Sequence, residues 1–328
     1  MKNISIYTCH HKASAFLSSD LIKPIHVGKA LSLNDICCSG DNTGDNISYK
    51  NPFYCELTAH YWVWKNAELS DYVGFMHYRR HFNFSSDQSF EEDTWGMVNY
   101  PEIDSDYESK FGLSAEAIAE CLREHDLIVP KKWSVKAAGS KNNYHHYKVS
   151  DHLHIKDYQD ALDILLKNHP EYSEAVETFN DAHDGYYTNM YVMRKELFVE
   201  YSEWLFGILD ELETVLSFRN YSAQEKRVFG HISERLFNIF VVHKIQKENI
   251  KLKELQRTFV QKETFNGSIS TRFHDNCIPI VICSDDNYAM SLGALLNSIL
   301  RNSSNDNNYD IVVLDNGLSH RSKERLLS

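Results

Sequence analysis

Residues 52–82 have the sequence PFYCELTAHYWVWKNAELSDYVGFMHYRRHF, and this stretch decides the fold class of the chain. Its aromatic and apolar residues recur at helical spacing, which predicts a helix over residues 53–68 that begins next to Pro52. Residues 72–76, YVGFM, predict a short buried strand that runs directly into the charged cluster HYRRH of residues 77–81. A helix followed by such a strand is the repeating unit of α/β proteins.

The same alternation extends outward in both directions from this stretch. Residues 4–8, ISIYT, predict a first strand that opens into the polar sequence CHHK. Further strands are predicted at 126–129 and 187–193, and helices at 114–124, 157–168, 171–180, 195–216 and 223–246. Strands that alternate with helices predict an α/β fold with a mainly parallel sheet flanked by helices.

The C-terminal part of the chain repeats this pattern from a new start. Residues 256–277 are polar and lack a clear period, which predicts a linker after a first domain over residues 1–255. Residues 278–328 begin with the apolar strand IPIVIC, followed by a helix over 289–300 and a second strand over 309–315. This partial βαβ segment is too short for a whole domain, so we expect it to be the start of a second domain that continues further.

Composition excludes several classes of protein. The chain has 328 residues and a formal net charge of −12, whereas nucleic-acid-binding domains show a basic footprint. Seven cysteines without a CxxC pair predict free thiols in a reducing cytoplasm. We expect neither a signal peptide nor a membrane span, because no apolar stretch is long enough. Residues 85–108, which include Asp87, are acidic without Lys or Arg and predict a solvated loop.

Residues 41–51, DNTGDNISYKN, form a turn-rich loop before the predicted helix. Asp and Asn oxygens suit sugar hydroxyls, and glycine lets the backbone approach a ligand closely. Asp41, Asp45 and Asn46 are therefore candidates for binding a sugar or a nucleotide. The alternative is that the same side chains hold the loop itself through Asx turns.

Two predicted strands end in polar clusters, at the position where open α/β sheets bind their ligands. His77, Arg79 and Arg80 follow one strand, and Lys12 follows the other. Because paired arginines bind diphosphates through charge-assisted hydrogen bonds, these residues are candidates for a diphosphate site. No Asp-x-Asp motif follows either strand, so we predict no metal ligand there. The alternative is a cluster of surface salt bridges.

On the helix predicted over 223–246, Arg227, His231, Glu234 and Asn238 share one face, turned away from the apolar stripe. Such a face is either solvated or borders a cleft. If it borders a cleft, Glu234 is the leading candidate for a general base, and the other carboxylate candidates are Asp184 and Asp126. The remaining candidates for contacts with a sugar or a nucleotide are His10, Tyr78, Asn189 and Arg235.

Several ordered strings carry a resemblance to a known family. They are PIHVG at 24–28, GDNTGDNIS at 40–48, YCELT at 54–58, VGFMHYRR at 73–80, NMYVM at 189–193 and RVFGHISERL at 227–236. Over about residues 1–255 the chain resembles the bacterial capsule and O-antigen family catalogued as domain of unknown function 4422. The strings are long and keep their order, which makes the resemblance specific.

The resemblance implies a glycosyltransferase with a GT-A-like sheet. Such an enzyme would move a hexose, galactofuranose in characterised members, from a UDP-sugar to a lipid-linked or nascent polysaccharide acceptor. We expect an inverting transfer that needs no cofactor within residues 1–255. The acidic net charge predicts that the chain binds no nucleic acid. The free thiols predict a cytoplasmic location, with peripheral association at the inner face of the plasma membrane as an option. The sequence leaves the oligomeric state open.

Residues 278–288, IPIVICSDDNY, resemble the first βαβ unit of glycosyltransferase family 8. Members of that family usually bind a divalent metal through an Asp-x-Asp motif, which here would lie beyond Ser328, so we expect a metal only in that missing part. The tandem arrangement is similar to that of bifunctional O-antigen polymerases. The alternative function is a non-catalytic carbohydrate-binding or scaffold module of a polysaccharide-assembly enzyme.

Overall fold

The computed structural model describes residues 2–33, 36–85, 88–262, 273, 275–304 and 306–327, in two compact units, Met1–Asn266 and Gly267–Ser328. Asp87 of the acidic loop, residues 263–272 and 274 of the predicted linker, and residues 305 and 328 lie outside the described residues. Each unit has its own sheet.

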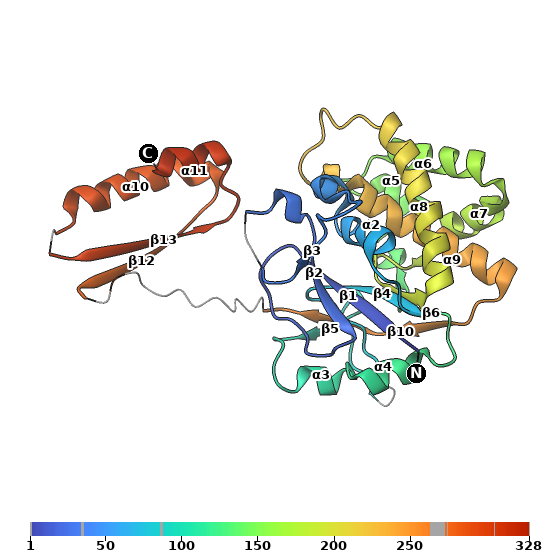
Figure 1. Cartoon of the computed structure of the whole chain (residues 1–328). Helices are drawn as coiled ribbons and strands as arrows, with labels where there is room; N and C mark the ends of the chain where they lie inside the picture. Colours follow the sequence, from blue (N-terminus) through green and yellow to red (C-terminus); the bar gives the residue numbers. More distant parts are fainter. Residues whose placement is uncertain are drawn as a thin grey trace. The chain divides into compact units, whose positions relative to one another are not determined.

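A seven-stranded sheet forms the centre of the first unit, with the strand order β10-β6-β9-β4-β1-β2-β3 (Figure 1). Its strands are β1 (Ile4–His10), β2 (Ile22–His26), β3 (Ser39–Gly40), β4 (Tyr72–His77), β6 (Leu127–Pro130), β9 (Tyr191–Arg194) and β10 (Leu252–Leu255). Neighbouring strands are parallel except at β9, which runs antiparallel to β4 and β6. The predicted α/β fold with a mainly parallel sheet is confirmed.

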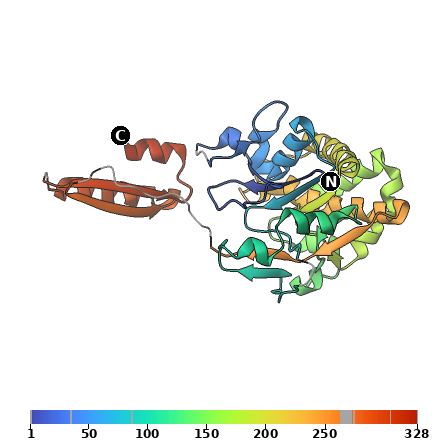
Figure 2. The ribbon, with the colours of Figure 1, turned by 60° about the horizontal axis from the view of Figure 1, so that its bottom comes forward.

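Helices cover both faces of this sheet. Because side chains alternate between the two faces along a strand, each strand contributes residues to both buried layers. On β1, Tyr7 and Cys9 belong to one buried cluster, and Ile4 and Ile6 belong to the other. The first face is covered by α1 (Asn51–Tyr54), α2 (Leu57–Asn66), α5 (Asn143–Val149), α6 (Ile155–Asn168), α7 (Ser173–Asp181), α8 (Lys195–Val215) and α9 (Val228–Glu248). The second face is covered by α3 (Tyr107–Lys110) and α4 (Ala115–Leu122), on the other side of the sheet from α8 and α9 (Figures 1 and 2).

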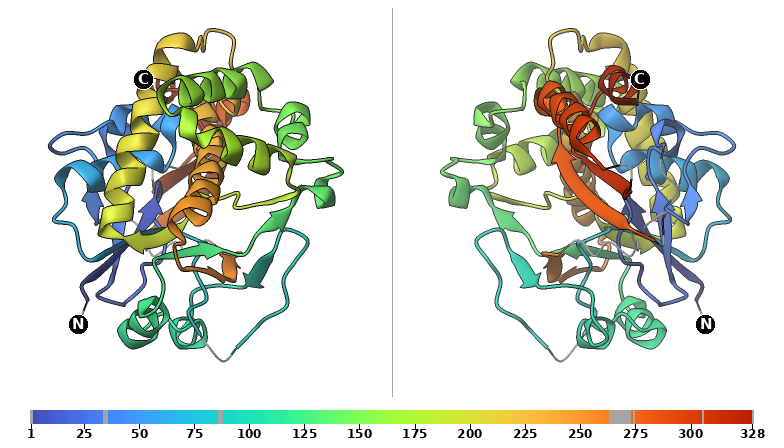
Figure 3. Two further views of the ribbon diagram at one scale, coloured as in Figure 1. Left: turned by 90° about the vertical axis from the view of Figure 1, so that its right-hand side faces the viewer. Right: turned by 90° about the vertical axis from the view of Figure 1, so that its left-hand side faces the viewer.

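The long helices α8 and α9 lie on the same face of the sheet (Figure 3). The apolar stripe predicted for α9 is buried in this layer, for example at Ile232, Leu236 and Ile239. Because that stripe packs inward, the polar face of the helix is available to border a site.

Two small sheets join segments that are far apart in the sequence. β5 (Met97–Tyr100) pairs in parallel with β11 (Arg257–Val260), and β7 (Trp133–Ser134) pairs antiparallel with β8 (Asp184–Gly185). β11 follows β10 almost directly. The first unit therefore extends past Leu255, where the sequence placed the end of the first domain, and into the predicted linker.

The second unit contains β12 (Cys277–Ser284), α10 (Ala289–Asn302), β13 (Asn308–Asp315) and α11 (His320–Leu327). The two strands are parallel over their whole length, with Cys277 opposite Asn308, and α10 connects them. This is the partial βαβ segment that the sequence predicts. In neither unit does the described chain contain a helix with the length and apolar character needed to cross a bilayer.

Candidate active site

Two cavities lie at the edge of the seven-stranded sheet where its parallel strands end. The strand-end cavity has a volume of about 530 Å³, and its lining includes Cys55, Glu56, His77, Tyr78, Arg79, Arg80, Arg227, Glu234 and Phe259. The aromatic cavity has a volume of about 680 Å³, and its lining includes Arg80, Trp95, Trp133, Ser140, His146, Tyr187, Thr188, His231, Glu234, Arg235 and Arg257. The two cavities meet at Arg80 and Glu234, which line both.

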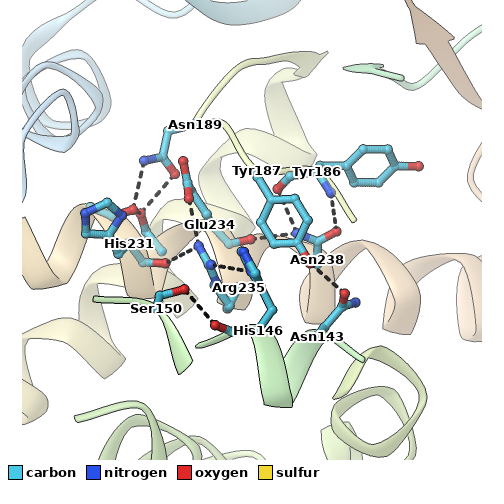
Figure 4. A network of polar contacts seen from close by, with 12 residues as sticks. Asn143, His146, Ser150, Tyr186, Tyr187, Asn189, His231, Glu234, Arg235 and Asn238 are labelled. Carbon is cyan, nitrogen blue, oxygen red and sulfur yellow. Dashed lines mark hydrogen bonds and ion pairs between the residues drawn. The ribbon is translucent and has the colours of Figure 1, made fainter. Parts of the chain in front are cut away.

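The two cavities together form one cleft, and the polar face of α9 forms one of its walls. Glu234 and His231 line the aromatic cavity, and Arg227, just before the helix, lines the strand-end cavity. Asn238 on the same face binds backbone instead. Its Oδ1 accepts from the amide of Tyr186 at 2.8 Å, and its Nδ2 donates to the carbonyl of Tyr186 at 2.8 Å (Figure 4). The face therefore borders the cleft and is not simply solvated.

Glu234 is the carboxylate at the junction of the two cavities. Burial raises the pKa of Glu234 to about 7, while the ion pair with Arg235 opposes the rise and the nearby Glu56 adds to it. Arg235 Nη1 lies 2.8 Å from Glu234 Oε2 (Figure 4). A carboxylate that titrates near neutral pH is well suited to accept a proton from a hydroxyl group and to release it again.

Glu56 is a second, partly buried carboxylate, and no motif or spacing in the sequence indicated it. The helix predicted over 53–68 is interrupted at Cys55, whose φ of 53° is left-handed, and Glu56 follows the interruption and lines the strand-end cavity. Asn189 Nδ2 donates to Glu56 Oε1 at 2.6 Å, and His77 Nε2 lies 4.0 Å from the same oxygen. Burial alone would raise the pKa of Glu56, but His77 and the hydrogen bond from Asn189 hold it below its ordinary value. Two carboxylates with pKa values pushed apart are typical of acid–base sites.

Arg257 in β11 is a buried cation that the sequence patterns did not indicate, because it falls in the predicted linker. Only 6% of its surface is exposed. Its Nη2 donates to the carbonyl of Trp95 at 2.8 Å, whereas its Nε and Nη1 have no hydrogen-bond partner among the described residues. Burial and the nearby Arg80 lower the pKa of Arg257 to about 10. Two guanidinium groups held close together favour the binding of an anion between them.

β11 also supports the arginine pair that follows β4. The ring of Phe259 lies 4.8 Å from the guanidinium carbon of Arg79 and 5.6 Å from that of Arg80. Both arginines line the strand-end cavity together with His77 and Arg227. The cationic strand end predicted from the sequence is therefore brought together with Arg227, just before α9, and with Arg257 of β11.

Comparison with known families bears on these same elements. The family described as "Domain of unknown function (DUF4422)" matches residues 5–246. This chain belongs to that family. The sequence resemblance is thereby confirmed. The match contains β4 and nearly all of β1 and α9, whereas β11 with Arg257 follows it.

A solved structure described as the apo structure of the bifunctional glycosyltransferase WbbM is similar to this DUF4422 chain. The two are 64% identical with a TM-score of 0.81, and the alignment covers 99% of this chain and 57% of the WbbM chain. The chain thus spans little more than half the length of that relative. No curated protein matches it.

In this DUF4422 chain, Asp41 does not contact the cleft, which corrects the expectation from its sequence. The residue is fully buried. Its Oδ2 accepts from the amide of Gly28 at 2.9 Å, and its Oδ1 accepts from the amide of Lys29 at 3.1 Å and from the hydroxyl of Ser48. These bonds fix the loop between β3 and α1 onto the end of β2, so Asp41 is structural.

Asp45 and Asn46 likewise hold the loop. Asp45 Oδ1 accepts from the Tyr61 hydroxyl at 3.1 Å. Asn46 Nδ2 donates to the carbonyl of Gly44 at 3.0 Å, and its Oδ1 accepts from the amide of Ser48 at 3.2 Å. The Asx-turn alternative therefore describes this loop, and neither residue lines the two cavities. A sugar contact of Asp45 or Asn46 stays a prediction.

His10 is also structural, contrary to its place among the candidates. Its Nδ1 is bonded to Ser14 Oγ at 2.7 Å and its Nε2 to Thr8 Oγ1 at 3.0 Å. Burial lowers its pKa to about 4, so the ring is neutral. Tyr78 lines the strand-end cavity, and Lys12 Nζ lies 5.8 Å from the centre of its ring. A diphosphate contact of Lys12 stays a prediction.

Of the three candidate bases, Glu234 borders the cleft and the other two are placed elsewhere. Asp126 lies at the amino end of β6, where its Oδ1 is 3.2 Å from Arg194 Nε and its Oδ2 accepts from the amide of Lys251 at 2.9 Å. Asp184 is exposed on β8. The parallel strands end at the opposite edge of the sheet, so Asp126 lies away from the cleft.

Asn189 and Arg235 position the two carboxylates. Asn189, which donates to Glu56, also accepts from the hydroxyl of Ser233 at 2.9 Å. Arg235 donates to Glu234 and to His146 Nδ1 at 3.5 Å, and its guanidinium carbon lies 4.8 Å from the ring centre of Tyr187 (Figure 4). Within the described ranges, no group of three His, Cys, Asp or Glu side chains converges as a metal site requires.

Proposed function

We propose that this chain is an inverting glycosyltransferase that moves a hexose from a UDP-sugar to a glycan acceptor in capsule or O-antigen synthesis. The observation that carries the proposal is Glu234, whose pKa is raised to about 7, at the junction of two cavities that also share Arg80. The likeness to the bifunctional glycosyltransferase WbbM supports this class of reaction. The family resemblance favours galactofuranose as the sugar.

The strand-end cavity is the proposed site of the donor. It lies at the carboxyl ends of β1 and β4, where open α/β sheets bind nucleotides. Arg79, Arg80 and Arg227 line it, and guanidinium groups bind phosphates through paired, charge-assisted hydrogen bonds. As the bond between the anomeric carbon and the diphosphate breaks, these cations would stabilise the negative charge that develops on UDP.

Glu234 is the proposed general base. In its ionised form it takes the proton of an acceptor hydroxyl while the hydroxyl oxygen attacks the anomeric carbon, and UDP leaves from the opposite side with the bonding electrons. A single displacement of this kind inverts the anomeric configuration. Glu56, hydrogen-bonded to Asn189, acts as a fixed negative charge that contributes to the raised pKa of Glu234.

The purified chain tests this proposal when it is incubated with UDP-galactofuranose, UDP-galactose or UDP-glucose and a lipid-linked or synthetic galactoside, with and without EDTA. We expect transfer from UDP-galactofuranose, with inversion detected by NMR of the product. We also expect transfer to persist in EDTA, because arginines line the proposed diphosphate site. Binding of the galactoside without transfer from any donor would instead favour the non-catalytic carbohydrate-binding or scaffold module.

A further inference from the structure

The aromatic cavity is lined by buried polar groups that the proposed chemistry of Glu234 does not use. Ser140 Oγ, Thr188 Oγ1, His231 Nε2, Arg235 Nε and two nitrogens of Arg257 are all buried without a hydrogen-bond partner in the part of the chain that the structure describes. All five residues line this one cavity. A buried polar atom without a hydrogen-bond partner destabilises the folded chain. The concentration of these unpartnered atoms around one cavity therefore indicates a ligand that supplies the missing hydrogen-bond partners.

The chemistry of these five groups narrows the class of ligand. The arginine nitrogens only donate hydrogen bonds, whereas the hydroxyls of Ser140 and Thr188 and the ring of His231 can donate or accept. A ligand that matches them must both accept and donate, over a cavity of about 680 Å³. The hydroxyl groups of a saccharide have this property, and a cavity of this volume is large enough for more than one sugar ring.

An aromatic platform stands beside these polar groups. The rings of Trp95 and Trp133 are stacked, with centroids 5.3 Å apart and an angle of 25° between their planes. Trp133 is buried and its Nε1 donates to the carbonyl of Thr94 at 2.9 Å, whereas Trp95 is 55% exposed. An indole with a free apolar face packs against the C–H face of a sugar ring, in the same way that aromatic residues form platforms in other polar-ligand sites.

Trp95 is held firmly in place although its side chain is exposed. Its amide donates to Asp93 Oδ1 at 2.8 Å, and its carbonyl accepts from Arg257 Nη2 at 2.8 Å. Because the backbone is fixed on both sides of the residue and the ring is stacked on that of Trp133, little conformational entropy remains to be lost when a ligand packs on the ring. Arg257 thereby links the platform to the junction with the strand-end cavity.

We infer that the aromatic cavity binds the acceptor saccharide, with one sugar ring on the Trp95–Trp133 platform and a hydroxyl directed to Glu234. That this saccharide is the acceptor rests on the proposed function, whereas its binding in the cavity does not. The nucleotide is assigned to the other cavity, since that cavity lies at the ends of β1 and β4. A nucleobase on the Trp95 ring is the competing arrangement, and the test separates the two.

Binding of a synthetic galactoside oligosaccharide and of UDP, each alone, to the full chain tests the inference by calorimetry. We expect Trp95→Ala to weaken galactoside binding about tenfold or more, in line with the loss of an aromatic contact of about 1.5 kcal/mol. Trp95→Phe, which keeps an aromatic ring, should retain most of the affinity, and UDP binding should be unchanged in both. Tyr49→Ala removes an aromatic side chain that is 60% exposed and is expected to change neither affinity.

Ser140→Ala is a second test of the inference that does not depend on whether Trp95→Ala folds correctly. It removes a hydroxyl for which no intramolecular partner exists among the described residues, so the fold should be kept while galactoside binding weakens several-fold. If Trp95→Ala weakens UDP binding and spares the galactoside, or if both Trp95→Ala and Ser140→Ala bind the galactoside normally, the inference is overturned. Binding that depends on Trp95 in a chain that transfers no sugar would uphold the saccharide site and refute the proposed function.

Discussion

Asp41 accepts hydrogen bonds from the backbone amides of Gly28 and Lys29 and from the hydroxyl of Ser48. We expect Asp41→Ala to lower the free energy of unfolding by about 3 kcal/mol, because buried donors lose a charged acceptor. Urea denaturation measures this change. The matched control is Asp45→Ala, which removes an exposed carboxylate from the same loop and should cost about 1 kcal/mol or less, because its hydrogen bond from Tyr61 is exposed to solvent. If Asp41→Ala instead leaves the stability unchanged and raises the KM for the donor, Asp41 is a ligand-binding residue.

Single residues were predictable where their chemistry and their position agree. Helical spacing placed Glu234 on the polar face of α9, and the rule that strand ends bind ligands placed Arg79 and Arg80 at the cleft. Asp41 was misassigned because carboxylate oxygens suit amide donors as well as sugar hydroxyls. Glu56 was missed because it lies in what the sequence presents as one helix, and no spacing rule indicates the interruption before it.

At the scale of elements, β11 is a strand that local patterns could not assign, and the same holds for β2, β5 and β10. β11 is four residues long and pairs with β5, which lies far earlier in the chain. Its strand conformation therefore depends more on pairing with β5 than on a periodic pattern of apolar residues in its own sequence. Short strands of this kind carry a weak sequence signal. The strands of the central sheet at β1 and β4 are longer and more apolar, and their positions were predicted to within a few residues.

The contribution of β11 to the site is testable by two shortened chains. A chain that ends after Asn266 keeps β11, and one that ends after Leu255 loses it. We expect the first to bind UDP as the full chain does, and the second to bind it at least about tenfold more weakly, since Arg257 and the Phe259 ring beneath the arginine pair are gone. Calorimetry measures the affinity and circular dichroism verifies the helices. Equal UDP affinity in two folded chains would show that β11 is dispensable for the donor site.

At the scale of the whole molecule, the first unit brings several strand ends to one edge. β1, β4, β6 and β10 end there, and the antiparallel β9 begins there. The alternation of strands and helices predicts the class of sheet, but the strand order depends on how distant segments pack and could not be inferred from local patterns. That order is what places α9, β11 and the end of β4 around one cleft.

The proposed chemistry of this cleft depends on whether Glu234 takes the acceptor proton, and the pH dependence of kcat/KM for transfer measures this most directly. Glu234 must be ionised to act, and its pKa is raised to about 7. Activity should therefore fall about tenfold for each pH unit below that value. Glu234→Gln keeps the shape of the side chain but cannot accept the proton, so its kcat should drop by about 10²–10⁴-fold while UDP still binds. Wild-type transfer by Glu234→Gln, or a rate that does not decline in acid, would contradict the assignment of Glu234 as the base.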